Sequence, residues 1–330
     1  MDRIRKSIQP LASKCRLNRL IRLSGQYNIF PFYHTVSGQQ APHLAHVYKV
    51  RSPEEFEKDL DLLLKEFEAV SPGDYLSQTG NNHGKRCMVL SFDDGLKECH
   101  SYIAPLLRKK GVPAVFFLNN KFIDNRGLFY RYKVSLLIQK VKEDSKAMEQ
   151  IREFLKVKAE QLERSLRMIA FDQRALLDTL AEMIGLDFSM YLHHSPVYLN
   201  YAEVKDLLHW GFDIGGHSSE HINFTLLDAS EMVAQVKESI ENLQKRFGIE
   251  TRYFSFPFSS DGVPLRVIDS ILDEGIAELL MGTSGLKLTG RKGFVQRIPM
   301  EDFRTDAEDA LKTEFLYYLL KKPLGRNRLR

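Results

Sequence analysis

The feature that most constrains the fold is a short apolar stretch that ends in two acidic residues. Residues 87–95 have the sequence CMVLSFDDG. An apolar run of this length without polar alternation is typical of a strand buried on both faces. Carboxylates at the end of such a strand cost free energy unless something there requires them, and strand ends carry the chemistry in parallel α/β folds. The stretch therefore predicts a metal site and a general base at the mouth of a sheet or barrel.

Strand and helix patterns alternate around this stretch. A helical pattern ends at Gly111 and an apolar strand follows at 112–118, which gives a strand–helix–strand unit and predicts parallel pairing. Another helix begins at Ser52, since Pro follows at the first helical position and Glu55 completes a capping box. The chain is thus expected to have an α/β fold. Further strands are expected at 27–34 and 253–258, from Phe212 into the pair Gly215–Gly216 and around 294–299. The segment from Ala277 to Met281 precedes the last of these without an assigned structure.

Residues 125–195 differ in composition from the rest of the chain. They hold few β-branched residues and many Leu, Lys, Glu and Arg, with apolar residues at helical spacing. We expect a helical insertion that lies over the barrel; its function is left open, with a lid and a substrate-specificity element as the candidate roles.

Composition excludes several protein classes. With 330 residues, 43% of them hydrophobic and 27% charged, the chain has the composition of a globular protein with a sizeable core. Its three cysteines are widely spaced, so neither a disulfide framework nor a thiolate zinc site is expected. We expect the protein to lie in a reducing compartment. No apolar run is long enough for a membrane span, and the basic N-terminal residues precede no apolar signal region. These features predict a cytoplasmic protein.

Positive charge is concentrated in two segments. Residues 1–25 carry a net charge of +6 and residues 311–330 a net charge of +5, whereas the whole chain carries only +4. We expect a basic N-terminal segment at 1–26, a barrel at 27–305 and a basic C-terminal tail at 306–330. Solvated tails are the first interpretation, and peripheral contact with an anionic membrane surface is the second. Nucleic acid is not expected as a partner, because no interleaved aromatic–basic motif occurs.

Two histidines and two aspartates form the candidate site. His217 and His221 lie four residues apart after a strand and a Gly pair, and imidazole together with carboxylate suits divalent transition metals. Adjacent residues of a strand point to opposite sides, so one of Asp93 and Asp94 could bind the metal while the other stays a free base. Asp94 with the two histidines would leave a position for water. The alternatives are two histidines without a ligand and an ordinary Asp-Asp-Gly turn.

These residues resemble the motifs of a known family. Residues 91–95 (SFDDG) resemble the first motif of the polysaccharide deacetylase family, the NodB homology domain, and residues 217–221 (HSSEH) resemble its second motif, H-S/T-x-x-H. Residues 253–258 (YFSFPF) resemble the third motif in degenerate form. The resemblance runs from about residue 28 to 300, with 125–195 as an insertion. It implies a distorted (β/α) barrel and metal-dependent removal of N-acetyl groups from amino sugars.

The resemblance implies a role for each residue. Asp93 is similar to the general base, and Asp94, His217 and His221 are similar to the ligands of a divalent metal, with zinc expected and cobalt or nickel as alternatives. Metal-bound water would attack the amide carbonyl of an N-acetylated saccharide, and Asp93 would take the proton. The metal and a backbone N–H near Phe258 would stabilise the oxyanion.

The general acid departs from the usual family pattern. The family commonly draws it from a late L-x-H motif, but no histidine follows His221. Residues 32–36 (FYHTV) instead resemble the Y-H-x-V motif of a branch that includes poly-N-acetylglucosamine deacetylases, in which an early histidine is the acid. We therefore expect His34 to be the general acid and Tyr33 to contact substrate. The alternative is a buried histidine satisfied by aromatic neighbours.

The third motif departs as well. The family often has R-x-P-Y, whereas residues 255–258 read SFPF, so the arginine that would orient the base is missing. We expect Arg297, in the last strand, to orient Asp93, and Pro257 and Phe258 to contact substrate.

The leading hypothesis is a cytoplasmic metal-dependent hydrolase that removes acetyl groups from an amino-sugar glycan or glycan intermediate. The basic ends suggest, as a further hypothesis, a lipid-linked or nucleotide-linked substrate at the inner face of a membrane. One alternative is a deformylase that acts on a lipid-linked formamido sugar. Another is a glycan-binding or scaffold protein without turnover, which the degenerate third motif favours and the intact Asp93, Asp94, His217 and His221 oppose.

Overall fold

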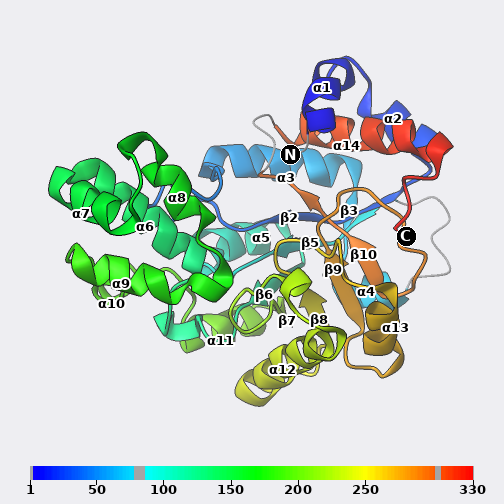
Figure 1. The fold of residues 1–330 in the computed structure, drawn as a ribbon. Coiled ribbons are helices and arrows are strands. Elements are labelled where there is room, and N and C mark those ends of the chain that lie inside the picture. Colours follow the sequence, from blue (N-terminus) through cyan, green and yellow to red (C-terminus); the bar gives the residue numbers. More distant parts are fainter. Residues whose placement is uncertain (1–2, 78–85, 302–305, 330) are drawn as a thin grey trace.

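A parallel sheet curls into a nearly closed barrel (Figure 1). The computed structural model describes residues 3–77, 86–301 and 306–329. Every pair of neighbouring barrel strands is parallel, which confirms the predicted (β/α) barrel. In sheet order the strands are β10 (Phe294–Gln296), β9 (Leu279–Gly282), β8 (Tyr253–Ser255), β7 (Asp213–Gly216), β6 (Ala114–Leu118), β5 (Leu90–Phe92), β2 (Pro31–Tyr33) and β11 (Ile298–Pro299).

One short segment closes the barrel. Strand β10 pairs with β9, and β11, which follows after a single residue, pairs with β2 at the other end of the strand order. The residue between them is Arg297, so its position is fixed from both sides by strand pairing. Since the two edge strands are consecutive in the chain, the barrel has little exposed sheet edge.

Two of the predicted strands divide into shorter ones. The segments 27–34 and 87–92 each contribute first to a small sheet and then to the barrel. In the small parallel sheet, β4 (Cys87–Met88) lies between β1 (Asn28–Ile29) and β3 (Glu68–Ala69). Phe30 and Val89 are the points of division. The strand that leads to the two aspartates is therefore β5, which is buried at all three positions.

Helices cover the outside of the barrel. Helix α3 (Pro53–Glu66) begins as predicted. The backbone N–H of Glu55 donates to Ser52 Oγ at 3.2 Å, and the backbone N–H of Ser52 donates to the Glu55 carboxylate at 2.9 Å. Gly248, with φ 70°, ends the longest helix in the described part of the chain. The other covering helices are α4 (Pro72–Ser77), α5 (Ala104–Lys110), α11 (Tyr201–His209), α12 (Ala229–Phe247) and α13 (Leu265–Asp273).

The insertion is helical, as its composition predicted, and lies beside the barrel (Figure 1, green). It has an apolar core of its own, which includes Leu137, Ile151 and Leu180. Leu96 and Tyr198 join that core from the barrel side, so the insertion is packed against the barrel. Its helices are α6 (Tyr130–Glu143), α7 (Ser145–Leu155), α8 (Leu162–Met168), α9 (Ala175–Met183) and α10 (Phe188–His194).

The two basic segments are packed helices, so the solvated-tail interpretation is wrong. Helices α1 (Arg3–Ala12), α2 (Leu17–Ser24) and α14 (Ala307–Lys321) lie together (Figure 1, top). The reason is amphipathic spacing, because the apolar side chains of α2 and α14 join the main core of the barrel. The predicted boundary at residue 305 lies outside the described residues. In the described part of the chain, no helix is long and apolar enough to span a bilayer. The core residues are Leu17, Leu20, Ile21, Ala307, Leu311 and Phe315.

Candidate active site

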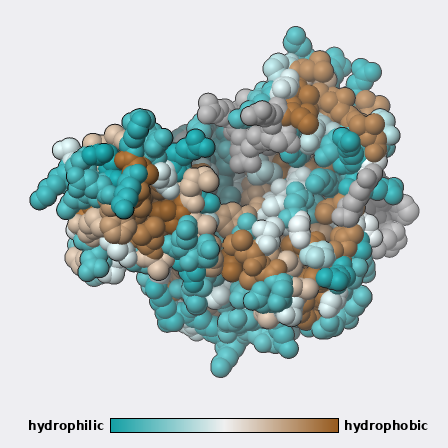
Figure 2. Space-filling view, viewed as in Figure 1, coloured by the Kyte–Doolittle hydropathy of each residue, from teal (hydrophilic) through white to brown (hydrophobic). Residues whose placement is uncertain are grey.

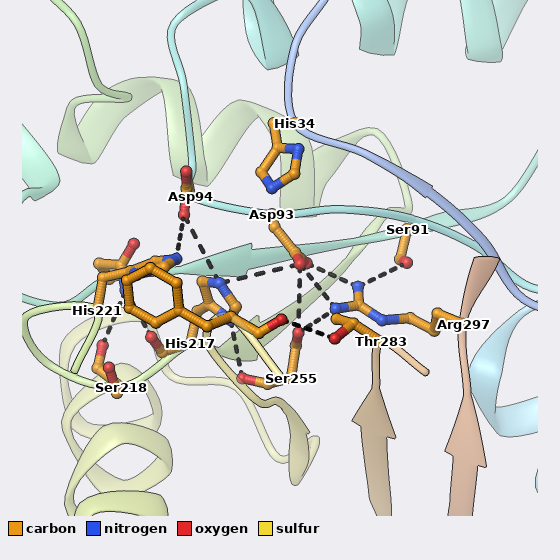
Figure 3. A network of polar contacts seen from close by, with 12 residues as sticks. His34, Ser91, Asp93, Asp94, His217, Ser218, His221, Ser255, Thr283 and Arg297 are labelled. Atoms are coloured by element: carbon orange, nitrogen blue, oxygen red, sulfur yellow. Dashed lines mark hydrogen bonds and ion pairs between the residues drawn. The ribbon is translucent and has the colours of Figure 1, made fainter. Parts of the chain in front are cut away.

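Three potential metal ligands meet at the ends of barrel strands (Figure 3). Asp94 follows β5, and His217 and His221 follow β7. Asp94 Oδ1 lies 3.6 Å from His217 Nε2 and 3.3 Å from His221 Nε2. All three side chains are buried, and their ligand atoms lie within 4.8 Å of one another. The structure thus brings together the three residues that the sequence predicted as ligands.

The polar atoms of this cluster fit a divalent cation. Asp94 Oδ1 and His221 Nδ1 are buried and have no hydrogen-bond partner in the described part of the chain. His217 Nδ1 donates to the Ser255 carbonyl at 2.8 Å, which leaves the Nε2 lone pair toward Asp94. Burial lowers the pKa of His217 from 6.5 to about 4, so the imidazole is neutral at pH 7, as a metal ligand must be. Two imidazoles and an unpartnered carboxylate oxygen are a suitable ligand set for zinc and similar ions.

The backbone at these residues is in the left-handed region. φ is 70° at Asp94 and 56° at His221. Such conformations cost free energy in residues other than glycine and are concentrated at functional sites. Gly95, with φ 65°, follows Asp94, and a Cβ there would lie 2.7 Å from Leu118 Cδ2. The turn brings Asp93 and Asp94 into the same cavity, rather than to opposite sides as in a continued strand.

Asp93 forms a buried two-point ion pair with Arg297. The two guanidinium nitrogens donate to Asp93 Oδ1 and Oδ2, each at 2.7 Å, and Ser91 Oγ accepts from the same guanidinium at 3.0 Å. Arg297 is fully buried and Asp93 is 2% exposed. Burial alone would raise the pKa of Asp93, but the charge of Arg297 outweighs it and the pKa falls below its usual value. The contact is the one that the sequence predicted for Arg297.

The model of the polysaccharide deacetylase family matches residues 80–161 and 170–273, more than half of the chain. The chain belongs to the polysaccharide deacetylase family. The enzymes of this family are hydrolases that act on N-acetyl amide bonds of carbohydrates. Each matched segment contains part of the site. The first holds the two aspartates and the second holds the two histidines.

Solved structures show the same fold at low sequence identity. IcaB from Ammonifex degensii is 17% identical with a TM-score of 0.56, and the match covers 88% of this chain and 97% of IcaB. The deacetylase PplD from Streptococcus pyogenes, solved in complex with acetate, is 13% identical with a TM-score of 0.54, covering 87% of this chain and 97% of PplD. Polysaccharide deacetylase BA0330 from Bacillus anthracis is 14% identical with a TM-score of 0.52, and the match covers 88% of this chain and 69% of BA0330. No curated protein matches the sequence.

His34 of this deacetylase-family site is held by a residue that the sequence analysis missed. His34 Nδ1 lies 2.5 Å from Glu301 Oε2, and Glu301 Oε1 accepts from the backbone N–H of His34 at 3.0 Å. Burial alone would lower the pKa of His34, but the Glu301 carboxylate outweighs it and raises the pKa from 6.5 to about 9. Glu301 comes just after the last strand pattern, a position of the same kind as that of Asp93, and that signal could have identified it.

The insertion contributes to the site as well. Tyr132, from α6, donates its hydroxyl to Asp94 Oδ2 at 2.9 Å, and Tyr48 forms a hydrogen bond with the Tyr132 hydroxyl at 2.9 Å. The Tyr48 ring also stacks on the His34 ring, with the centroids 4.5 Å apart. Phe129, which precedes α6, packs on His221 with the ring centroids 4.4 Å apart. Sequence reasoning singled out none of these aromatic residues. The spacing of Phe129 and Tyr132 in the insertion indicates only core helices, and Tyr48 lies before α3 in no recognised motif.

One cavity of about 470 Å³ is lined by His34, the two aspartates and the two histidines, and its size suits a small ligand such as a sugar unit. Phe258 lines it and is 40% exposed, so its substrate contact stays a prediction that the geometry permits. Pro257 is buried and does not line this cavity. Pro257 therefore offers no surface for the predicted substrate contact. It directly precedes Phe258, which does line the cavity.

The predicted substrate contact of Tyr33 is wrong. Tyr33 is fully buried, and its hydroxyl donates to Asp59 at 3.2 Å on the outer side of the barrel wall. Its ring packs on Phe56 and Phe92 within the main core. Because alternate residues of a strand point to opposite faces, His34 can reach the cavity only if Tyr33 faces away from it.

Proposed function

We propose that the chain is a metal-dependent hydrolase that removes the N-acetyl group from an amino sugar of a glycan or glycan intermediate. The observation that carries this proposal is the buried cluster of Asp94, His217 and His221, next to an aspartate held by Arg297. Those three residues would hold the divalent ion, with zinc as the expected metal and cobalt or nickel as alternatives. The bound ion would supply Lewis acidity and lower the pKa of a water molecule.

Asp93 is the proposed general base. Its lowered pKa keeps it ionised at neutral pH, so it can accept a proton. Each oxygen receives one hydrogen bond from Arg297, and Oδ2 also accepts from Ser255 Oγ at 3.4 Å. A carboxylate oxygen has a second acceptor position, so Oδ1 is the oxygen that can accept the proton. Asp93 Oδ2 lies 3.8 Å from His217 Nε2, beside the cluster, and the two bonds of its carboxylate to Arg297 support the role of base rather than of ligand. Arg297 thus fixes the orientation of the base.

His34 is the proposed general acid. With a pKa of about 9 it carries its proton at neutral pH. Nδ1 is bound to Glu301, and the ring lies at the cavity wall, so Nε2 is the nitrogen that can donate to the leaving amine. Figure 3 shows the ring of His34 directed toward the two aspartates.

Phe258 is the proposed source of the oxyanion-stabilising N–H. Its backbone is left-handed, with φ 59°, and its carbonyl accepts from Thr283 Oγ1 at 2.7 Å. Its own N–H donates no hydrogen bond within the described part of the chain. A fixed and unused donor at the cavity wall suits the charge that develops on a carbonyl oxygen under attack.

The test is metal content and product release on the same samples. Wild type is expected to hold about one metal per chain and to release acetate from N-acetylated oligosaccharides, whereas His217→Ala should lose both. His194→Ala, which removes an exposed histidine bonded only to the Met190 carbonyl, is the matched control. Formate release from a formamido sugar instead of acetate would favour a deformylase. Metal without any release would favour the scaffold alternative, and no metal in wild type would contradict the proposal.

A further inference from the structure

We infer that α1, α2 and α14 form a docking surface for an anionic lipid bilayer, which we call the terminal surface. This inference is independent of the reaction that the enzyme catalyses. It starts from exposed aliphatic side chains. In the described part of the chain, six Leu and Ile side chains are strongly exposed, and five of them belong to these helices or to the residues just after α14. The five are Ile4 (56% exposed), Leu11 (58%), Leu23 (56%), Leu320 (51%) and Leu324 (63%).

The exposed side chains belong to one contiguous surface. Lys322 Nζ donates to the Ser24 carbonyl at 3.4 Å, so the end of α14 lies beside the end of α2. At the other end, Ser13 Oγ donates to Asp309 Oδ2 at 3.2 Å, which joins the end of α1 to the start of α14. Figure 2 shows apolar residues gathered over these helices, with hydrophilic residues between and around them. Exposed apolar patches of this kind mark interaction sites.

Basic side chains surround the exposed leucines. Arg16, Arg19 and Arg22 follow one another at intervals of three along the outer side of α2, and all three are exposed. None of them forms an ion pair with a carboxylate in the described residues. After α14, Arg326 and Arg328 are exposed as well. The surface therefore combines unpaired positive charge with leucines, as interfacial amphipathic helices do.

A groove beside α2 strengthens the charge argument. It has a volume of about 1030 Å³ and is lined by α2, by the preceding turn with Lys14, and by parts of α3 and α14. The two acidic residues that line it are already paired, Glu308 with Lys312 at 2.9 Å and Glu66 with Arg86 at 2.8 Å. The arginines of α2 are left to attract an external anion. A lipid phosphate fits this chemistry, and the neighbouring leucines fit the acyl region beneath it.

The charge distribution favours a bilayer over a second copy of the chain. Residues 1–25 and 311–330 carry +6 and +5, while the remainder of the chain is net negative. Two terminal surfaces facing each other would repel, whereas an anionic bilayer is complementary to both the charge and the leucines. Nucleic acid would match the charge, but it would leave the exposed leucines without a partner.

The test is sedimentation of the full chain with phosphatidylcholine vesicles, with and without phosphatidylglycerol. Wild type is expected to sediment only with the anionic vesicles and to be released by salt. The triple variant Arg16→Gln, Arg19→Gln, Arg22→Gln should weaken binding roughly a hundredfold, and Leu23→Gln with Leu324→Gln roughly tenfold. The matched control is Lys146→Gln, Lys158→Gln, Arg164→Gln, which removes three exposed charges from the insertion and should bind like wild type.

Three results would overturn the inference. One is wild type that stays in solution with anionic vesicles. Another is equal binding by the α2 triple variant and the insertion control, with circular dichroism showing that both are folded. The third is a wild type that binds a DNA duplex, or dimerises through Leu23 and Leu324, without binding vesicles. Acetate release from a soluble substrate should be unchanged in all these variants, because none of the substituted residues lines the catalytic cavity.

Discussion

The barrel and the insertion contribute to the same cavity in different ways. The barrel supplies charged groups at strand ends, each held by an oppositely charged or polar partner: Asp93 by Arg297 and His34 by Glu301. The insertion supplies a hydroxyl and an aromatic ring, from Tyr132 and Phe129. The difference indicates a division of labour, in which the barrel carries out proton transfer and metal binding and the insertion adjusts their surroundings. Changes in the barrel groups should then cost more than changes in the insertion.

The largest effect is expected for the proposed base. Asp93→Asn removes the proton acceptor but keeps the shape of the side chain, so kcat should fall roughly 10²–10⁴-fold. Metal content should stay at the wild-type level, since Asp93 is not among the three clustered ligands. Asp61→Asn, at a carboxylate whose side chain is 61% exposed, is the control. Loss of metal in Asp93→Asn would show that Asp93 is a ligand and would break the assignment.

Arg297→Ala should also lower turnover with metal content unchanged. At present Arg297 lowers the pKa of Asp93 against the effect of burial, so its removal raises that pKa and the acid limb of the pH–rate profile should move to higher pH. The variant also leaves a buried carboxylate unpaired, which costs about 3–5 kcal/mol of stability. Arg297→Lys retains the charge without the two-point contact and should show an intermediate shift. Normal turnover in Arg297→Ala would contradict the positioning role.

The pair of His34 and Glu301 predicts a shift of the basic limb of the pH–rate profile. Glu301→Gln removes the charge that raises the pKa of His34, so the basic limb of the pH–rate profile should move from near pH 9 to lower pH. The His34–Glu301 pair should also make the free energy of unfolding depend on pH. The folded-state pKa lies above the ordinary value of 6.5, so the ion pair stabilises the fold below pH 6.5 and its contribution is lost as pH rises through 9. A basic limb that is identical in wild type and Glu301→Gln would exclude His34 as the acid.

The sequence predicted the barrel groups well because motifs and strand ends specify them together. The SFDDG and HSSEH stretches locate the proposed ligands, and a short strand pattern locates Arg297. Glu301 and Tyr132 were missed because their roles depend on pairing between segments far apart in the chain. Glu301 meets His34 only because β11 pairs with β2, which no local pattern shows. The error at Tyr33 has a local origin instead, since strand alternation puts Tyr33 and His34 on opposite faces and only one of them can reach the cavity.

The insertion should show a smaller effect on metal binding. Tyr132→Phe removes one hydrogen bond to Asp94, which should weaken metal affinity roughly tenfold and leave the pH limbs in place. The measurement is competition with a chelator of known affinity. Tyr130→Phe, on the same helix but with a hydroxyl that does not bond Asp94, is the control. A loss as large as that of a direct ligand would show that the insertion is part of the metal site itself, and the proposed division of labour would fail.

The smallest catalytic effect is expected within the barrel, at Tyr33. Tyr33→Phe removes the hydrogen bond to Asp59, so the free energy of unfolding should fall by about 1 kcal/mol. Both kcat and KM should equal those of wild type, because Tyr33 faces the core and not the cavity. Phe258→Ala, at the exposed ring beside His221, should do the opposite and raise KM with little change in stability. The effect of a substitution on catalysis would then depend on whether the side chain faces the cavity or the core, and less on whether the residue belongs to the barrel. A raised KM in Tyr33→Phe would reject that conclusion.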